Sequence, residues 1–222
     1  MNIGFIGTGH ITSSVIEGIL KSKLKVNKIY ISPRNQIIAK KLSKKFKKVN
    51  ISKHNQQLIN VSDWVFLAVT PPVGEDILKH LYFKKNKQII SFISTTDINT
   101  IKQYTTNTNV TRVLPLPFIG IKKGPIIICP PNKKIKNFFK QLGKTIEIKN
   151  EEVSKNFWTT SSFMAPFYEM LAVKSNWLVS KGVKRKEAED YVRELFLALS
   201  QDAINKKNIS LKQLVSESQT PG

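Results

Sequence analysis

The fold is decided by residues 1–20, which read MNIGFIGTGHITSSVIEGIL. Ile3, Phe5 and Ile6 predict a short buried strand, and Gly7-Thr8-Gly9 breaks it. Apolar residues then recur at the spacing of an amphipathic helix, at positions 11, 15, 19 and 20. A strand, a glycine turn and a helix in this order form the first unit of a dinucleotide-binding fold.

The two glycines of this turn have separate predicted roles. Gly7 permits the tight turn, and Gly9 lets the backbone approach a pyrophosphate held at the helix amino terminus. The third position of the G-x-G-x-x-G/A pattern is Thr12. Because Thr is larger than Gly or Ala, we expect the helix and strand to pack slightly farther apart. The alternative interpretation is an ordinary strand–helix turn without a ligand.

Alternating strand and helix patterns continue to about residue 150. They predict a Rossmann-type, doubly wound, mostly parallel α/β domain over residues 1–150. Residues 151–222 are rich in aromatic and helix-forming residues and predict an all-helical domain. A hydrophobic helical domain of this kind commonly pairs with a copy of itself.

Composition excludes several classes of protein. The 222 residues contain no apolar run of the roughly 20 residues that span a bilayer. The single cysteine, Cys129, cannot form an internal disulfide, which favours the reducing cytoplasm, and its apolar surroundings predict a buried structural thiol. No cluster of Cys, His and carboxylate residues has metal-ligand spacing, so we expect no metal.

The net charge of +21 is unevenly distributed. Residues 1–150 contain 26 basic and 6 acidic residues, whereas the remainder is almost neutral. Such a field attracts polyanions, including nucleic acid. The lysines are dispersed, however, and the interleaved aromatic residues of a single-strand binder are not evident. A nucleic-acid-binding module therefore stays a minor alternative.

The cofactor type is predicted by residues 32–35, about 20 residues beyond the glycines. Enzymes that prefer NAD place a carboxylate there to bind the ribose 2′-hydroxyl. No carboxylate occurs between Glu17 and Asp63, and Ser32, Arg34 and Asn35 occupy this position instead. A guanidinium suits a 2′-phosphate by charge and geometry, which favours NADP(H). Alternatively, Arg34 is a solvated residue at a helix start.

Two further loops follow buried strands and are expected to line the ligand crevice. Thr70-Pro71 follows the apolar run 64–69 and is predicted to face the cofactor. Ser94-Thr95-Thr96 follows the run 88–93. Its hydroxyl groups suit hydrogen bonds to a nicotinamide or ribose, and turn and capping roles explain them equally well.

Together these motifs resemble the pyrroline-5-carboxylate reductase family along essentially the whole chain. IGFIGTGHI resembles its IGFIGxGNM start, with His10 in place of Asn, and FLAVTP at 66–71 is similar to its LAVKP loop. RVLP at 112–115 resembles RVMPNTP, although Leu116-Pro117 replaces the polar part, and APFY at 165–168 stands where the family has GSGPAY. Thr220-Pro221-Gly222 resembles the beginning of the SPGGTT loop, which supplies catalytic hydroxyls.

The resemblance implies NADPH-dependent reduction of a C=N bond in a small cyclic imino acid, as in proline biosynthesis, by a homodimer formed through the helical domain. Tyr168 is the best candidate proton donor or substrate-orienting residue, and a packed aromatic residue is the alternative. Cofactor contacts are expected at Gly7, Gly9, His10, Ile11, Ser32, Arg34, Asn35, Ala68, Val69, Thr70 and Pro71.

The departures from the family pattern lie on the substrate and nicotinamide side. They support an alternative function, a cofactor-binding paralogue that acts on another imine or has no catalysis. Because the sequence stops at Gly222, we expect the catalytic loop and the last helices of the family's dimerisation domain to be missing from it.

Overall fold

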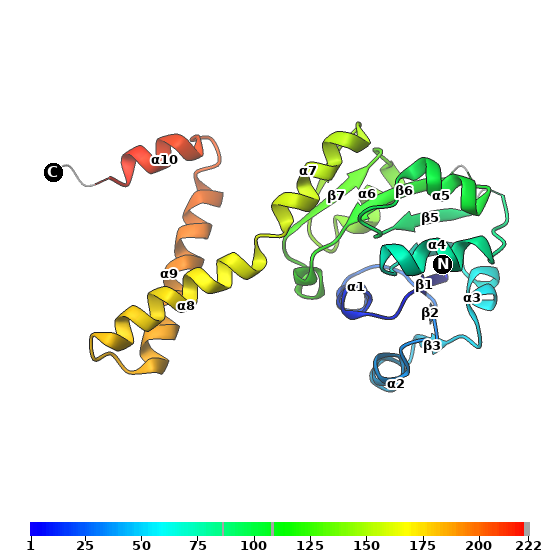
Figure 1. Cartoon of the computed structure of the whole chain (residues 1–222), viewed down its shortest axis with the longest axis horizontal. Coiled ribbons are helices and arrows are strands. Elements are labelled where there is room, and N and C mark those ends of the chain that lie inside the picture. Colours follow the sequence, from blue (N-terminus) through cyan, green and yellow to red (C-terminus); the bar gives the residue numbers. More distant parts are fainter. Residues whose placement is uncertain (86, 108, 220–222) are drawn as a thin grey trace. The chain divides into compact units, whose positions relative to one another are not determined.

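The computed structural model describes residues 1–85, 87–107 and 109–219. The chain forms two compact units, Met1–Ser161 and Ser162–Gly222. In the first unit, helices cover both faces of a β-sheet (Figure 1), and the described part of the second unit is helical. The predicted α/β part followed by a helical part is therefore confirmed.

The described residues of the first unit contain one eight-stranded sheet with the order β3-β2-β1-β4-β5-β6-β7-β8. Neighbouring strands are parallel except for β6 and β7, which are antiparallel. The chain starts at β1, builds outward to β3, and returns to β4 on the other side of β1. This reversal is the topological switch point of a doubly wound Rossmann-type sheet. The strands are β1 (Ile3–Ile6), β2 (Ile29–Ile31), β3 (Val49–Ile51), β4 (Trp64–Leu67), β5 (Gln88–Ser91), β6 (Val110–Leu114), β7 (Pro125–Cys129) and β8 (Lys144–Glu147).

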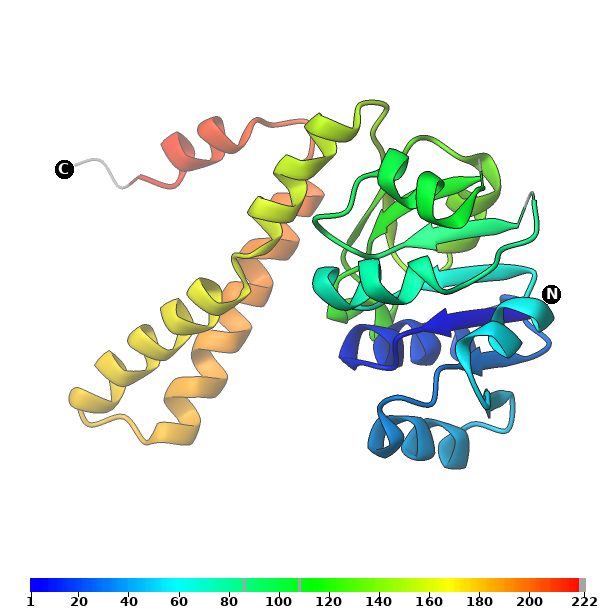
Figure 2. The same ribbon diagram turned by 45° about the vertical axis from the view of Figure 1, so that its right-hand side comes forward.

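Helices on both faces explain why the central strands are apolar throughout. Successive side chains of a strand point to opposite faces, so Phe5 and Phe66 pack in one core and Ile6 and Leu67 in the other. The first core includes side chains of α1, α2 and α6, and the second includes side chains of α3, α4 and α5. Figure 2 shows helices on both sides of the sheet. The helices are α1 (His10–Leu20), α2 (Gln36–Lys45), α3 (Asn55–Val61), α4 (Pro71–Lys79), α5 (Ile98–Thr105), α6 (Lys133–Phe139) and α7 (Glu151–Ser161), with a 3₁₀ helix η1 at Pro117–Ile121.

Helix α7 belongs with the sheet, so the two units divide after Ser161 rather than at the predicted boundary after residue 150. The physical reason is the burial of its first turn. Ser154 has no exposed surface, and Glu151 forms an ion pair with Arg112 of β6 at 2.7 Å. A composition change at residue 151 marks the start of helical structure but not the edge of the packed unit.

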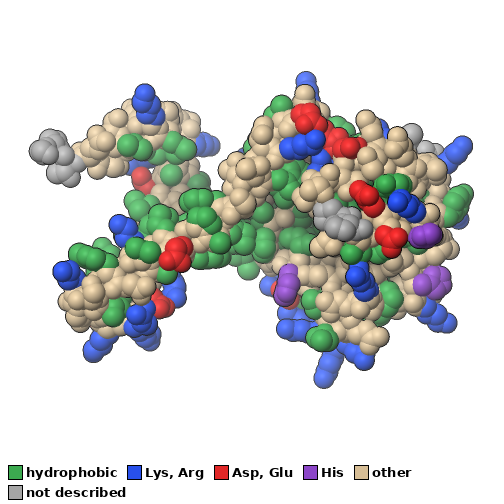
Figure 3. All heavy atoms as spheres, viewed as in Figure 1, with side chains coloured by type: hydrophobic (Ala, Val, Ile, Leu, Met, Phe, Trp, Pro, Cys, Tyr) green, Lys and Arg blue, Asp and Glu red, His purple; other side chains and the backbone are tan. Residues whose placement is uncertain are grey.

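The second unit contains α8 (Met164–Ser180), α9 (Arg185–Asn205) and α10 (Leu211–Glu217). Pro166 lies in the first turn of α8, where its missing N–H group costs little, so it does not interrupt that helix. Only Ser175, Ala188 and Val192 are buried among the described residues of this unit. Large apolar side chains are exposed instead, including Trp177, Leu197 and Ile204, and Figure 3 shows hydrophobic groups on its surface. No helix in the described ranges is long and apolar enough to cross a membrane.

Candidate functional site

A cleft of about 660 Å³ opens at the carboxyl ends of β1, β2 and β4, the position at which open α/β sheets bind ligands. It brings together eight of the residues that the sequence assigned to a cofactor site. These are Gly7, Gly9, Ser32, Arg34, Asn35, Ala68, Val69 and Thr70.

The glycine turn is shaped by one strained and one open position. Gly7 has a φ of +102°, and a Cβ atom placed on it would lie 2.2 Å from the carbonyl oxygen of Ala68. Gly9 has no neighbouring atom within 4 Å of such a position, so its backbone faces open space. Gly9 caps α1 without a side-chain hydrogen bond, and the first turn of α1 holds no acidic residue. The amino-terminal N–H groups of α1 are therefore suited to an anionic group such as a pyrophosphate.

Thr8 and Ser32 hold the turn against the end of β2. The Thr8 hydroxyl donates to the backbone carbonyl oxygen of Ser32 at 2.8 Å. The Ser32 hydroxyl accepts from the Gly7 N–H group at 3.1 Å and lies 3.2 Å from the Thr8 hydroxyl. Because the Thr8 proton is already donated, Ser32 is the donor in that last pair. Ser32 is 2% exposed, so its main role in this structure is to fix the turn.

The segment after β2 carries the charge that a 2′-phosphate requires. Arg34 is exposed beside the cleft, and the Asn35 side chain accepts a hydrogen bond from the N–H group of Ile38 at 3.2 Å. Asn35 thereby caps α2 and directs the amino terminus of that helix toward the same region. None of the described residues that line the cleft is acidic. The residues present therefore fit a phosphorylated ribose better than a free 2′-hydroxyl.

Asn55 also lines the cleft, although no local sequence pattern indicates it. It is the first residue of α3, in the loop after β3, and its side-chain oxygen Oδ1 is buried without a hydrogen-bond partner in the part of the chain that the structure describes. A buried acceptor without a partner is rare and usually has a reason. Ile37 of α2, 84% exposed, offers an apolar surface in the same cleft.

Of the other predicted site residues, His10, Ile11 and Tyr168 lie outside the described lining of this cleft. His10 and Ile11 form the first turn of α1, where His10 is exposed and Ile11 half-buried. Pro71 begins α4 directly after Thr70. Tyr168 belongs to the helical unit, where it is 54% exposed and lines a separate pocket between α8 and α9. The Thr220-Pro221-Gly222 motif lies outside the described residues.

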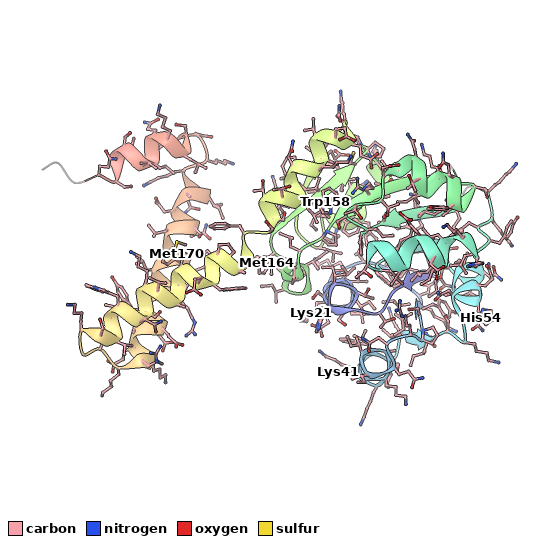
Figure 4. The ribbon with its side chains drawn as sticks, in the orientation of Figure 1. Lys21, Lys41, His54, Trp158, Met164 and Met170 are labelled. Carbon is pink, nitrogen blue, oxygen red and sulfur yellow. The ribbon has the colours of Figure 1, made fainter. Side chains whose placement is uncertain are left out.

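Lysines of α2 and of the end of α1 surround the carboxylate of Glu17. Glu17 is the last acidic residue before Asp63, and the Lys45 ammonium bonds its carboxylate at 2.8 Å. The hydrogen bond from Lys45 holds the pKa of Glu17 below its usual range, with Lys21 and Lys41 adding to the effect. Figure 4 shows Lys21 on α1 and Lys41 on α2. Between Glu17 and Asp63 the chain carries many lysines and no carboxylate, which gives this part of the sheet unit a net positive charge.

The cysteine and the possible metal ligands are the other candidate functional groups in the sequence, and neither contributes to the described lining of the cleft. Cys129 is 1% exposed, and burial raises the pKa of its thiol, which agrees with the predicted structural role. No group of His, Cys, Asp and Glu residues in the described ranges could hold a metal ion.

Residues 2–96 match the family model described as NADP oxidoreductase, coenzyme F420-dependent. Pyrroline-5-carboxylate reductase from Staphylococcus epidermidis is 25% identical over 225 residues, covering 96% of this chain and 83% of the relative. Among solved structures, 1-pyrroline-5-carboxylate reductase from Streptococcus pyogenes superposes with a TM-score of 0.83 at 22% identity, covering 100% of this chain and 86% of that one. Plasmodium falciparum pyrroline carboxylate reductase with NADP bound gives a TM-score of 0.82 at 19% identity, covering 100% and 85%. Over nearly its whole length the chain is therefore similar to pyrroline-5-carboxylate reductases, and its residues 2–96 match an oxidoreductase family model.

Proposed function

We propose that the chain binds NADPH in the cleft and reduces the C=N bond of a small cyclic imino acid of the pyrroline-5-carboxylate type. The observation that carries the proposal is the meeting of the glycine turn, Arg34 and the loop at Ala68–Thr70 around one cleft, whose described lining residues include none that is acidic. The similar reductases are named for the same substrate class, and one of the solved structures holds NADP.

Different residues of the cleft would bind different parts of the proposed cofactor. The amino-terminal N–H groups of α1, including those of His10 and Ile11, would bind the pyrophosphate, and Gly9 leaves space for it. Arg34 and Asn35 would hold the 2′-phosphate. Asn55 would accept a hydrogen bond from the adenosine part, which would give its buried oxygen a partner.

When bound, NADPH supplies a hydride to the carbon of the C=N bond. The protein must orient that bond, exclude water from it, and deliver a proton to its nitrogen as the hydride arrives. Tyr168 is the proposed proton donor, since a phenol can donate once it is desolvated. A homodimer formed through the helical unit is part of the proposal, because that unit exposes large apolar side chains that a second copy would cover. The cytoplasmic location stays a prediction from the single cysteine.

The test is a paired titration of the full chain and its Arg34→Ala variant with NADPH and with NADH, followed by NADPH oxidation in the presence of 1-pyrroline-5-carboxylate. We expect wild-type protein to prefer NADPH and the variant to lose about tenfold in NADPH affinity, with little change for NADH, because only NADPH carries the 2′-phosphate. Equal loss for both nucleotides would contradict the role of Arg34.

A second candidate function is cofactor binding without reduction of this imine. It is favoured by Leu116-Pro117, which replace a polar segment of the family, and Leu116 leads directly into η1. Tight NADPH binding without turnover of 1-pyrroline-5-carboxylate by full-length protein would favour this candidate.

A further inference from the structure

A wholly buried arginine ties the loop after β5 to helix α7. Arg112 lies on β6 with no exposed surface, and its Nη1 atom bonds the Glu151 carboxylate at 2.7 Å. Its Nη2 atom donates to the carbonyl oxygens of Ser94 at 2.5 Å and Ile93 at 3.3 Å. The guanidinium carbon lies 4.6 Å from the ring centroid of Trp158, which Figure 4 labels on α7. One side chain on β6 thus contacts two segments that are distant from it in sequence.

Stability alone does not account for this arrangement. Removing a guanidinium from water is costly, and a well-packed apolar side chain of similar size often gives equal or greater stability. The charged pair instead fixes the orientation of the groups that it bonds, because the planar guanidinium of Arg112 holds the carbonyl groups and the carboxylate at set angles. The Nε atom of Arg112 is buried without a hydrogen-bond partner among the described residues, a further cost of keeping the group in place.

Glu151 completes the connection at the other end of the loop. Its two carboxylate oxygens lie 3.0 and 3.3 Å from the N–H group of Ile98, at the start of α5. Arg112 therefore holds the carbonyl groups at the beginning of the segment 93–98, and Glu151 holds the N–H group at its end. Between these anchors, the side chains of Ser94 and Thr95 are exposed.

The anchored segment lies next to the wall of the cleft. A Cβ atom placed on Gly74 of α4 would lie 2.9 Å from the Ile93 side chain and 3.3 Å from the Val69 side chain, so the backbone there contacts both. Val69 lines the cleft. In a doubly wound sheet a dinucleotide crosses the switch point, so the half opposite the adenosine extends over β4 and β5.

We infer that Arg112 and Glu151 are positioning residues that hold the segment 93–98, with its exposed Ser94 and Thr95 hydroxyls, for the nicotinamide half of the cofactor. This inference rests on the proposed function, because it requires NADPH in the cleft. It assigns no direct ligand contact to Arg112 itself.

The test compares two probes on the full chain. NADPH carries both halves of the cofactor, whereas adenosine 2′,5′-bisphosphate carries the adenosine and 2′-phosphate without the nicotinamide. The variant is Glu151→Gln, which keeps the size of the side chain and removes its charge. The matched control is Glu147→Gln, which removes a carboxylate from the Lys136 ion pair of the same unit, away from the anchored segment.

We expect Glu151→Gln to weaken NADPH binding by about tenfold, the value of a hydrogen bond to a charged partner. Binding of the bisphosphate should stay within about twofold of wild type, because its contacts are remote from the anchored segment. The control should leave both affinities unchanged. Arg112→Lys, which keeps a positive charge but loses the planar fork, should reproduce the Glu151→Gln pattern.

Three results would overturn the inference. An equal loss for both probes in Glu151→Gln would mean that the ion pair only supports the fold. Unchanged NADPH binding would mean that the segment does not meet the nicotinamide half. Failure of wild-type protein to bind either probe would overturn the proposed function as well. This outcome can be distinguished from failure of the inference alone, because it is seen with wild-type protein and needs no variant.

Discussion

The hydroxyl group of Thr12 donates a hydrogen bond to the carbonyl oxygen of Gly7, and 2.8 Å separates the two oxygens. Thr12 is fully buried at the position where the fingerprint has Gly or Ala. The larger side chain is therefore accommodated, and its hydroxyl links the first turn of α1 to the glycine turn. A departure from the sequence pattern thus provides a contact that Gly or Ala could not make.

This link predicts the effect of Thr12→Val, which keeps the shape of the side chain and removes the hydroxyl. We expect the free energy of unfolding in urea to fall by about 1 kcal/mol, because the bond is lost and an apolar group replaces the hydroxyl. NADPH affinity should fall with it. Unchanged stability would mean that the hydrogen bond does not support the turn.

The two glycines of the turn should respond to alanine in opposite ways. Gly7→Ala must place a Cβ atom 2.2 Å from the Ala68 carbonyl oxygen at a φ of +102°, so we expect a loss of about 2 kcal/mol or more in stability. Gly9 has a φ of −108° and open space, so Gly9→Ala should change stability by less than about 0.5 kcal/mol. Its methyl group would nevertheless obstruct the pyrophosphate and weaken NADPH binding. Thermal unfolding and nucleotide titration of both variants separate the two effects.

Asn55→Ala should weaken NADPH binding without lowering the stability of the protein. The buried Oδ1 atom has no partner in the described part of the protein, so its removal should leave the melting temperature unchanged or slightly higher. NADPH affinity should fall by about fivefold, because the proposed hydrogen bond to the adenosine part is lost. A calorimetric titration with unchanged affinity would contradict the assignment of Asn55 to the cofactor site.

The capping role of the Asp97 carboxylate leads us to expect a loss of stability in acid. Its carboxylate caps α5 by accepting from the Thr100 N–H group at 2.7 Å, and this hydrogen bond lowers the pKa of the carboxyl below its usual range. A carboxyl whose pKa is lower in the folded state stabilises the protein above its unfolded pKa, and the contribution is lost as the pH falls through the folded pKa.

We therefore expect the Asp97 contribution to decline below about pH 4. Asp97→Asn keeps a capping side chain that does not titrate, so its stability should depend less on pH in this range. Asp97→Ala should cost about 1 kcal/mol at neutral pH. Urea unfolding of the three proteins at pH 3 to 7 measures both effects, and identical pH profiles for wild type and Asp97→Asn would refute the assignment.

The helical unit predicts self-association. Trp177 and Leu197 are 58% and 61% exposed, so the double change Trp177→Glu and Leu197→Glu should lower the average mass in sedimentation if a second copy covers them. Tyr82→Glu is a suitable control, because Tyr82 is 67% exposed on the sheet unit. The proposed dimer surface would be contradicted if the control changed the oligomeric state and the double variant of the helical unit did not.

The sheet could be predicted because its signals are local. The predicted strand at residues 3–6 and the apolar runs 64–69 and 88–93 correspond to β1, β4 and β5 within a few residues, and the glycine turn lines the cleft as expected. Helix α10 lies within the predicted all-helical domain, but its bounds could not be predicted, because Leu211–Glu217 is short and buries no side chain that would leave a clear apolar pattern.

Contacts between distant segments could not be predicted from the sequence. Asn55 follows a three-residue strand, and only the strand order brings it near Arg34. Arg112 was noticed only as part of a motif, since nothing in the local pattern indicates a bond to Glu151, 39 residues away. Ser32 was expected at the cofactor, but its hydroxyl already bonds Gly7 and Thr8.

The lysine-rich surface of the sheet unit, visible in Figure 3, affects a ligand before any contact is made. NADPH carries several negative charges, and a cleft with no acidic residue in its described lining, in a strongly positive field, draws such an ion inward from solution. Salt shortens the range of this attraction to about 8 Å at physiological ionic strength. The association rate of NADPH should therefore decrease steeply as salt is added, whereas its dissociation rate, set by contacts within the cleft, should change little.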